Sequence, residues 1–242
     1  MSSRDAWLAD VRAALRADQR LRTAFRPRRI EVTDDATVTI EAEAETVAIK
    51  RRVLSCIARV PGVVGIVDRI SVTPAGEMSD DGMLDHLRKA YLQEPAFRGY
   101  KLSEHADGAT RLVRQGLPGA SGEIEFEVAD GIVTLNGATH ALASRRLAGV
   151  LAWWVPGSRD VINAMAVEPP EEDAPIRIEE AVRIALEKDP LVNDTRIRVG
   201  VRGRTVRLTG LAASDWERDA AEWDAWYVLG VDEVVNDVRV GP

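Results

Sequence analysis

The chain has 242 residues, of which 45% are hydrophobic and 29% charged, and its formal net charge is −7. This composition is typical of a globular protein and argues against intrinsic disorder. The acidic balance argues against general nucleic-acid binding, which needs a basic surface. The sequence contains no run of about 18 apolar residues, so no transmembrane helix is predicted.

The first predicted element in each third of the chain is a helix. Apolar residues recur at helical spacing within residues 7–15, 83–91 and 178–186. Acidic residues, followed in two cases by proline, then end the pattern, at Asp18, Glu94-Pro95 and Asp189-Pro190.

A β-hairpin is predicted after each opening helix. Apolar and polar residues alternate across 197–208 around a turn at 202–203, and the same pattern fills 124–135 around a turn at 130–131. The first copy of this hairpin is one residue shorter, at the turn 34–35.

A second helix and a final strand complete each unit. Thr46 and Ser214 are suitable N-cap residues for two of these helices. A glycine closes each helix, at Gly62, Gly157 and Gly230. The last apolar residue of the final strand follows that glycine by ten residues in every copy, at Val72, Val167 and Val240.

The spacing within the three units is the same from the middle strand to the final strand. The second copy lies 95 residues after the first and the third lies 73 residues after the second, without insertion or deletion. We therefore predict three tandem α-β-β-α-β modules. In each, two helices cover one face of a three-stranded mixed sheet, which is an α+β fold. The open sheet faces are expected to be buried between the copies.

The predicted domains are residues 1–75, 79–168 and 174–242, with a stiff acidic linker at 169–175. The second domain carries an insertion at 98–123, rich in Gly, Ser, Pro and polar residues. This composition predicts a mobile segment with a short helix at 110–115. A functional role and a surface elaboration remain equal alternatives for the insertion.

The strand ends at Gly137 and Gly210 and the helix exit Val60-Pro61-Gly62-Val63 resemble those of the BON domain of bacterial osmotic-stress and nodulation proteins. The first unit departs from this pattern with Ala42 in place of the strand-end glycine. Further points of resemblance are the final-strand runs Val161-Ile162-Asn163 and Val234-Val235-Asn236. The resemblance implies a non-enzymatic module without catalytic residues. It further implies association with phospholipid, or with other proteins at membranes, and a link to envelope integrity and osmotic stress.

Arginines and tryptophans on one helix of the second unit are the predicted contact for anionic phospholipid: Arg145, Arg146, Trp153 and Trp154. Five arginines in residues 20–29 are expected to help. Residues 1–75 carry a net charge of +3, whereas 76–168 carry −4 and 169–242 carry −6, so the second and third units oppose this contact. Packing between units or between subunits is the alternative role of these aromatic residues.

The third unit's second helix carries four aromatic residues outside its predicted core stripe: Trp216, Trp223, Trp226 and Tyr227. Large aromatic side chains on a second helix face need a partner surface. We therefore predict a protein-contact surface, used by a protein-interaction adaptor or a homo-oligomer. The ligand, the partner and the assembly state are not determined by the sequence.

Asp68, Asn163 and Asn236 occupy one equivalent position in the final strands, where we expect their side chains to satisfy local backbone groups rather than bind a ligand. The three histidines, His86, His105 and His140, lack metal-ligand spacing. No metal, cofactor or catalytic residue is predicted. An enzyme with a pocket beside residues 98–123 is a third alternative.

Cys56 is the only cysteine, so no intrachain disulfide can form. The sequence begins Met-Ser-Ser-Arg-Asp-Ala-Trp, without the apolar stretch of a secretory signal. These two features predict a cytoplasmic protein.

Overall fold

The computed structural model describes residues 3–106, 108–119 and 122–241. They fall into two compact units, Met1–Thr73 and Pro74–Pro242. Three mixed sheets, of three, six and three strands, are combined with helices in a repeating order. The predicted α+β fold of three α-β-β-α-β repeats is confirmed, although the second sheet is larger than expected.

The first unit is a two-layer module. β1 pairs antiparallel with β2, and β2 pairs parallel with β3, as the crossover through α3 requires. Alternate residues of β2, such as Val38 and Ile40, are buried against Val11, Val53 and Ile57 of the helices. Its elements are α1 (Ser3–Ala17), α2 (Gln19–Ala24), β1 (Pro27–Val32), β2 (Thr37–Ala44), α3 (Val47–Ala58) and β3 (Gly65–Val72).

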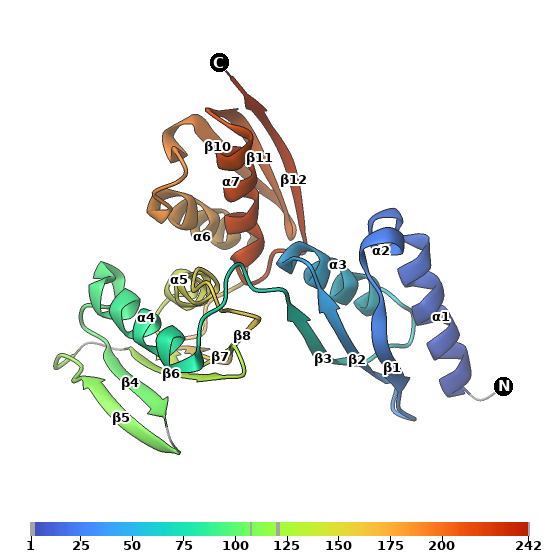
Figure 1. The fold of residues 1–242 in the computed structure, drawn as a ribbon, viewed down its shortest axis with the longest axis horizontal. Coiled ribbons are helices and arrows are strands. Elements are labelled where there is room, and N and C mark those ends of the chain that lie inside the picture. The colour runs from blue at the N-terminus through green and yellow to red at the C-terminus, as the bar shows by residue number, and fades with distance from the viewer. Residues whose placement is uncertain (1–2, 107, 120–121, 242) are drawn as a thin grey trace. The chain divides into compact units, whose positions relative to one another are not determined.

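The second unit contains the second and third modules. In the second module, α4 and α5 lie on one face of the sheet (Figure 1). The strand order of this sheet is β5-β4-β6-β7-β8, and the short β9 also pairs with β7. The elements of this second module are α4 (Asp80–Gln93), β4 (Lys101–Ala106), β5 (Ala109–Arg114), β6 (Glu123–Ala129), β7 (Ile132–Thr139), α5 (Leu142–Trp153), β8 (Asp160–Asn163) and β9 (Ala166–Val167).

The prediction that the insertion is mobile and forms a helix at 110–115 is wrong, because the described part of the insertion forms the hairpin β4–β5. β4 continues the sheet by pairing parallel with β6. Leu102 is fully buried in the module core, and the buried Glu104 accepts a 2.6 Å hydrogen bond from Nε of Arg88 on α4. The hairpin is therefore an extension of the sheet, fixed by both apolar and ionic contacts.

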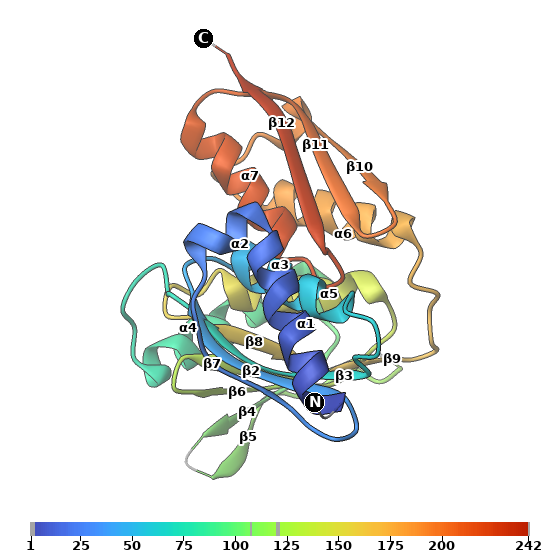
Figure 2. The ribbon, with the colours of Figure 1, turned by 90° about the vertical axis from the view of Figure 1, so that its right-hand side faces the viewer.

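The third module repeats the fold without an insertion. Its strands follow the order β10-β11-β12, antiparallel then parallel, with α6 and α7 packed on one face (Figure 2). Its elements are α6 (Pro175–Lys188), β10 (Ile197–Arg202), β11 (Thr205–Ala212), α7 (Asp215–Tyr227) and β12 (Glu233–Val240).

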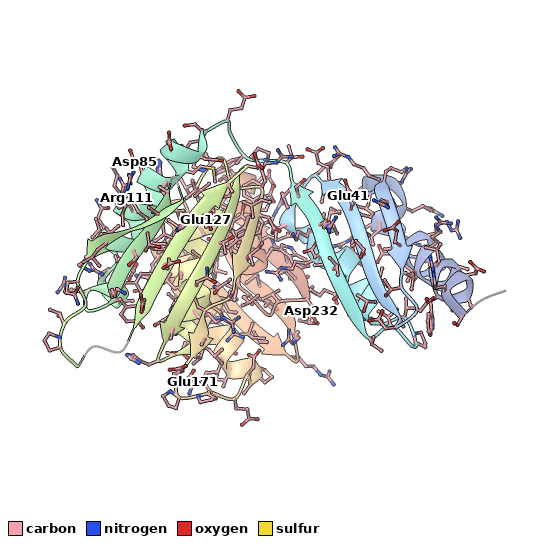
Figure 3. The ribbon with its side chains drawn as sticks, turned by 90° about the horizontal axis from the view of Figure 1, so that it is seen from below. Glu41, Asp85, Arg111, Glu127, Glu171 and Asp232 are labelled. Atoms are coloured by element: carbon pink, nitrogen blue, oxygen red, sulfur yellow. The ribbon has the colours of Figure 1, made fainter. Side chains whose placement is uncertain are left out.

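The expected burial of sheet faces between copies is wrong for the second and third modules, which meet through their helices. α5 packs against α6 and α7. The outer sheet faces are exposed or half-exposed and carry many polar side chains, together with a few apolar ones such as Ile162 and Leu211. Glu127 lies on the outer face of the second sheet (Figure 3). Across the outer face of the third, Arg207 and Asp237 form an ion pair at 2.7 Å with both side chains largely exposed. Such faces are already compatible with water and need no cover.

The two strand-end glycines and the first module's alanine have a common explanation. Gly137 and Gly210 adopt φ of +109° and +129°, and a side chain there would collide with the carbonyl oxygen of Glu123 in β6 or of Arg196 just before β10. In the first module the strand register shifts between Pro27 and Arg29, which leaves room for the buried Ala42.

The predicted backbone role of the Asx position is confirmed in all three modules. The side-chain oxygens of Asp68, Asn163 and Asn236 each accept a hydrogen bond from the backbone N–H two residues later. Each side chain also reaches the preceding helix: Asp68 pairs with Lys50, and the two asparagines donate to the carbonyl oxygens of Arg145 and Arg218. The predicted caps are confirmed too, because Thr46 and Ser214 accept N–H hydrogen bonds at the starts of α3 and α7.

Candidate binding site

The contact between the second and third modules contains most of the helix residues that the sequence singled out. α5 lies beside α6 and α7 at this contact (Figure 1). Ile184 of α6 packs against the core cluster of the second module, so the two modules share apolar as well as polar contacts.

Arg146 crosses the contact as a buried cation with only 2% of its surface exposed. Its Nε donates to the carbonyl oxygen of Leu229 at 2.7 Å, and its Nη2 donates to Asp173 at 2.5 Å. Asp173 also pairs with Arg204 of the third module at 3.2 Å. The guanidinium therefore joins the second module, the linker and the third module.

Two aromatic residues of the second module complete the contact. Trp153 is buried and stacks on Tyr227 of α7, with ring centroids 5.8 Å apart and planes 11° apart. The indole N–H of Trp154 donates to Oδ1 of Asp224 at 2.9 Å. A further ion pair, between Lys188 of α6 and Glu94 at the end of α4, spans 3.0 Å.

Of the four residues predicted to contact lipid, Arg146, Trp153 and Trp154 are thus brought together at the contact between the second and third modules. Arg146 and Trp153 are buried, and Trp154 and Arg145 are half-buried. Arg145 donates to the carbonyl oxygen of Asn163 at 2.9 Å, and burial lowers the pKa of its guanidinium. In this arrangement Arg146, Trp153 and Trp154 hold the two modules together, as the packing alternative expects, whereas Arg145 bonds within its own module.

The structure divides the aromatic residues predicted to contact a partner into two groups. Trp216 and Trp223 are 59% and 36% exposed and meet edge to face, with centroids 5.2 Å apart. Trp226 is buried, and its indole N–H donates to Glu222 at 3.4 Å. Tyr227 belongs to the contact with the second module. Of these four residues of α7, only Trp216 and Trp223 form an aromatic surface open to solvent.

A pocket of about 480 Å³ in the first unit lies between α1, α2 and the start of β1. Apolar side chains, including those of the buried Leu21 and Phe25, form part of its lining. The remainder is strongly basic, because six arginines line it: Arg12, Arg16, Arg22, Arg26, Arg28 and Arg29. We call this feature the arginine pocket.

Local sequence explains how the arginine pocket forms. Asp18 begins α2 by accepting the backbone N–H groups of Arg20 and Leu21 at 3.0 and 3.1 Å, and it also accepts from Nε of Arg52 at 2.7 Å. Burial alone would raise the pKa of Asp18, but the hydrogen bonds from Leu21 and Arg52 outweigh it and lower that pKa. The capped helix directs Leu21 to the core and Arg22 to the pocket.

The arginines of the pocket differ in their partners. Arg28 pairs with Glu43 at 2.9 Å and Arg29 with Glu31 at 2.6 Å. Arg12, Arg16 and Arg22 are exposed and form no ion pair with any other residue that the structure describes. Arg26 likewise pairs with no carboxylate among the described residues, and its Nη1 donates to the carbonyl oxygens of Arg22 and Phe25 at 2.7 and 2.8 Å. Guanidinium groups without a carboxylate partner beside apolar side chains suit a ligand with an anionic group and an apolar part.

A second pocket, of about 530 Å³, lies beside the insertion and bears on the enzyme alternative. Lys101 and Glu123 in its lining pair at 2.6 Å, and this pairing raises the pKa of Lys101. A lysine held in its protonated form does not serve as a general base. Within residues 3–106, 108–119 and 122–241, no group of three or more metal-ligating side chains is found, and no helix has the length and apolarity to cross a membrane.

Comparisons with known proteins agree with the repeat. A family model described as "BON domain" matches residues 4–74, 105–169 and 177–242. Among solved structures, the C-terminal domain of CdsD, a structural protein of the Type III secretion system of Chlamydia trachomatis, is 13% identical over 100% of both chains, with a TM-score of 0.25. Another structure of CdsD is 12% identical over 98% of this chain and 93% of its own, also with a TM-score of 0.25. No curated protein matches the chain.

Proposed function

The chain belongs to the BON domain family, and from that premise we propose that it is a non-catalytic binding and scaffolding protein whose first module contacts anionic phospholipid through the arginine pocket. The role belongs to stress or envelope-linked processes, as the family resemblance implies. A cytoplasmic location stays a prediction from the sequence.

The observation that carries the proposal is the set of three unpaired guanidinium groups, on Arg12, Arg16 and Arg22, beside apolar side chains. Each basic residue close to an anionic membrane contributes about 1 kcal/mol of attraction. Residues 1–75 are also the only third of the chain with a positive net charge, +3. Because Arg146 and Trp153 are engaged inside the protein, we assign the lipid contact to the first module.

The test is co-sedimentation of the full chain with vesicles, comparing phosphatidylglycerol-containing vesicles with pure phosphatidylcholine at low and high salt. We expect binding to the anionic vesicles only, weakened by salt. The triple variant Arg12→Gln, Arg16→Gln, Arg22→Gln should lose ~3 kcal/mol of binding, on the order of a hundredfold.

A matched control removes the same charge from the third module, with Arg198→Gln, Arg202→Gln and Arg239→Gln, three exposed arginines outside the pocket. The control should retain binding within about tenfold, because general electrostatic attraction alone is reduced. Equal losses in the two triple variants, or no binding of the native chain at low salt, would refute the proposed lipid contact.

A second candidate function, a protein-interaction adaptor or homo-oligomer, is favoured by the exposed Trp216–Trp223 pair. Aromatic residues dominate protein interfaces. The test is the mass in solution, measured by light scattering across protein concentration, for the native chain and Trp216→Ser, Trp223→Ser. A concentration-dependent mass that the double variant abolishes supports this role, whereas a concentration-independent monomer mass rules out the homo-oligomer.

A further inference from the structure

The carboxyl group of Asp224 lies deep in the contact between the second and third modules, with 2% of the residue exposed. Its Oδ1 accepts the indole N–H of Trp154 at 2.9 Å. Its Oδ2 is also buried and accepts no hydrogen bond from any described N–H or O–H donor. A carboxylate in this position is poorly solvated, which favours the protonated form.

The groups around Asp224 do not supply a compensating positive charge. From the end of α6, the carboxyl group of Asp189 faces it, while Oδ1 of Asp189 accepts the N–H of Leu191 at 2.8 Å. From α5 comes the neutral indole of Trp154, and from α7 itself the phenol of Tyr227. The negative charge of Asp189 opposes ionisation of the buried Asp224, because like charges repel each other strongly where water is excluded.

The nearby cations are already engaged elsewhere. Lys188, next to Asp189 in sequence, pairs with Glu94 of α4 at 3.0 Å. Arg146 directs its guanidinium to the Leu229 carbonyl oxygen and to Asp173. The buried carboxyl group of Asp224 is therefore stable in its protonated form, and it belongs to the contact that holds the two modules together.

We propose that Asp224, which faces Asp189, acts as a pH-dependent latch: the second and third modules stay docked while the Asp224 carboxyl group is protonated, and its ionisation releases them.

The sign of the pH effect follows from the protonation states. Burial, and then the charge of Asp189, raise the pKa of Asp224 to about 8, while an exposed aspartate titrates near pH ~3.9. Between these values the docked state binds more protons than the released state. The docking equilibrium therefore weakens by up to about tenfold per pH unit as pH rises through this range, and stops changing above it.

Tyr227 does not take part in this titration. Burial, followed by the charges of Asp224 and Asp189, raises its pKa to about 12, so its phenol stays neutral throughout. Release of the latch would uncover the stacked rings of Trp153 and Tyr227 and the guanidinium of Arg146. The latch would thus control whether an aromatic and cationic surface is accessible.

The test is hydrogen–deuterium exchange of the full chain from pH ~5 to pH ~9, compared with Asp224→Asn at each pH. Asparagine has the same shape, accepts from Trp154, donates to Asp189 and has no proton to lose. Comparing the native chain with the variant at the same pH removes the intrinsic effect of pH on the amide exchange rate. We expect equal protection of α5 and α7 at acidic pH and increasingly faster exchange of the native chain as pH rises.

Peptides from α3 in the first module are the internal control and should exchange equally in both proteins. A second variant, Asp189→Asn, removes the like charge and can donate to an ionised Asp224, so it should stay docked at alkaline pH where the native chain opens. If Asp224→Asn does not fold, the comparison of the native chain with Asp189→Asn tests the latch instead. Native exchange that matches the available variant at every pH overturns the latch.

Discussion

Nε of Arg146 donates to the carbonyl oxygen of Leu229 at 2.7 Å, which joins two modules across 83 residues of sequence. Arg146→Ala should lower the free energy of unfolding by about 2 to 4 kcal/mol, because it removes buried hydrogen bonds and leaves a cavity. Urea denaturation measures this change. Arg198→Ala, at an exposed arginine of β10, is the control and should change stability by less than about 0.5 kcal/mol. Equal stability of the two variants would contradict the role of Arg146.

Trp226 and Trp223 lie three residues apart but should respond differently to truncation. Trp226→Ala empties a buried site and should destabilise the protein by about 3 to 5 kcal/mol. Trp223→Ala removes an exposed ring and its edge-to-face contact with Trp216, at a cost of about 1 kcal/mol. Thermal unfolding of both variants checks this order, and a reversed order would mean that the Trp223 side of α7 is the covered one.

Gly210 should tolerate no side chain. Gly210→Ala combines an unfavourable φ of +129° with a collision against the Arg196 carbonyl oxygen, and should cost at least about 2 kcal/mol. Gly200→Ala in the neighbouring β10 is the matched variant, since a Cβ there has no atom within 4 Å. Its stability should stay within about 0.5 kcal/mol of native. Denaturant midpoints of the two variants give the comparison.

Cys56 should react slowly with iodoacetamide at neutral pH. Burial, and then the nearby Asp18 carboxylate, raise the pKa of the thiol, so less of the reactive thiolate is present. Asp18→Asn keeps the α2 cap but removes the negative charge, and should increase the alkylation rate at a given pH. Mass spectrometry across pH measures the rate, with Asp10→Asn on the exposed part of α1 as control. Unchanged alkylation in Asp18→Asn would rule out the electrostatic effect.

The repeat was predictable because its signals are local. Helix stops, capping residues such as Thr46 and Ser214, and turn glycines act within a few positions, and three copies at fixed spacing reinforce one another. The backbone role of Asn163 and Asn236 followed from the same short-range chemistry.

The hairpin β4–β5 was missed although its sequence carried a signal. The Asp-Gly pair at positions 107 and 108 is typical of a tight hairpin turn, but the glycine- and serine-rich stretch that follows suggested mobility. Strand formation there depends on the parallel pairing of β4 with β6 and on Glu104 meeting Arg88. Such tertiary contacts leave no short-range pattern.

The module contact and the arginine pocket were only partly predictable. The sequence identified Arg146, Trp153 and the arginines of residues 20–29 as unusual, but an arginine on a helix is normally exposed. The burial of Arg146 depends on Leu229 and Asp173, which are distant from it in sequence. The pocket in turn needs α2, whose six residues are too few for a clear helical period.

Each of the three repeat glycines lies under a large side chain. A Cβ at Gly62 would lie 2.6 Å from Nε1 of Trp7, and one at Gly157 would lie 2.6 Å from Sδ of Met83. Both covering residues come from the opening helix of the same module. At Gly230 the nearest atom is Nη2 of Arg146, at 3.0 Å, and the module's own Ile178 stays 3.7 Å away. The glycine of the third repeat is therefore covered by a side chain of the second repeat. Separating the two repeats at the acidic linker would leave Gly230 uncovered in one fragment and the guanidinium of Arg146 without its Leu229 partner in the other. Residues 74–242 should therefore be expressed, or fused to another protein, as a single fragment.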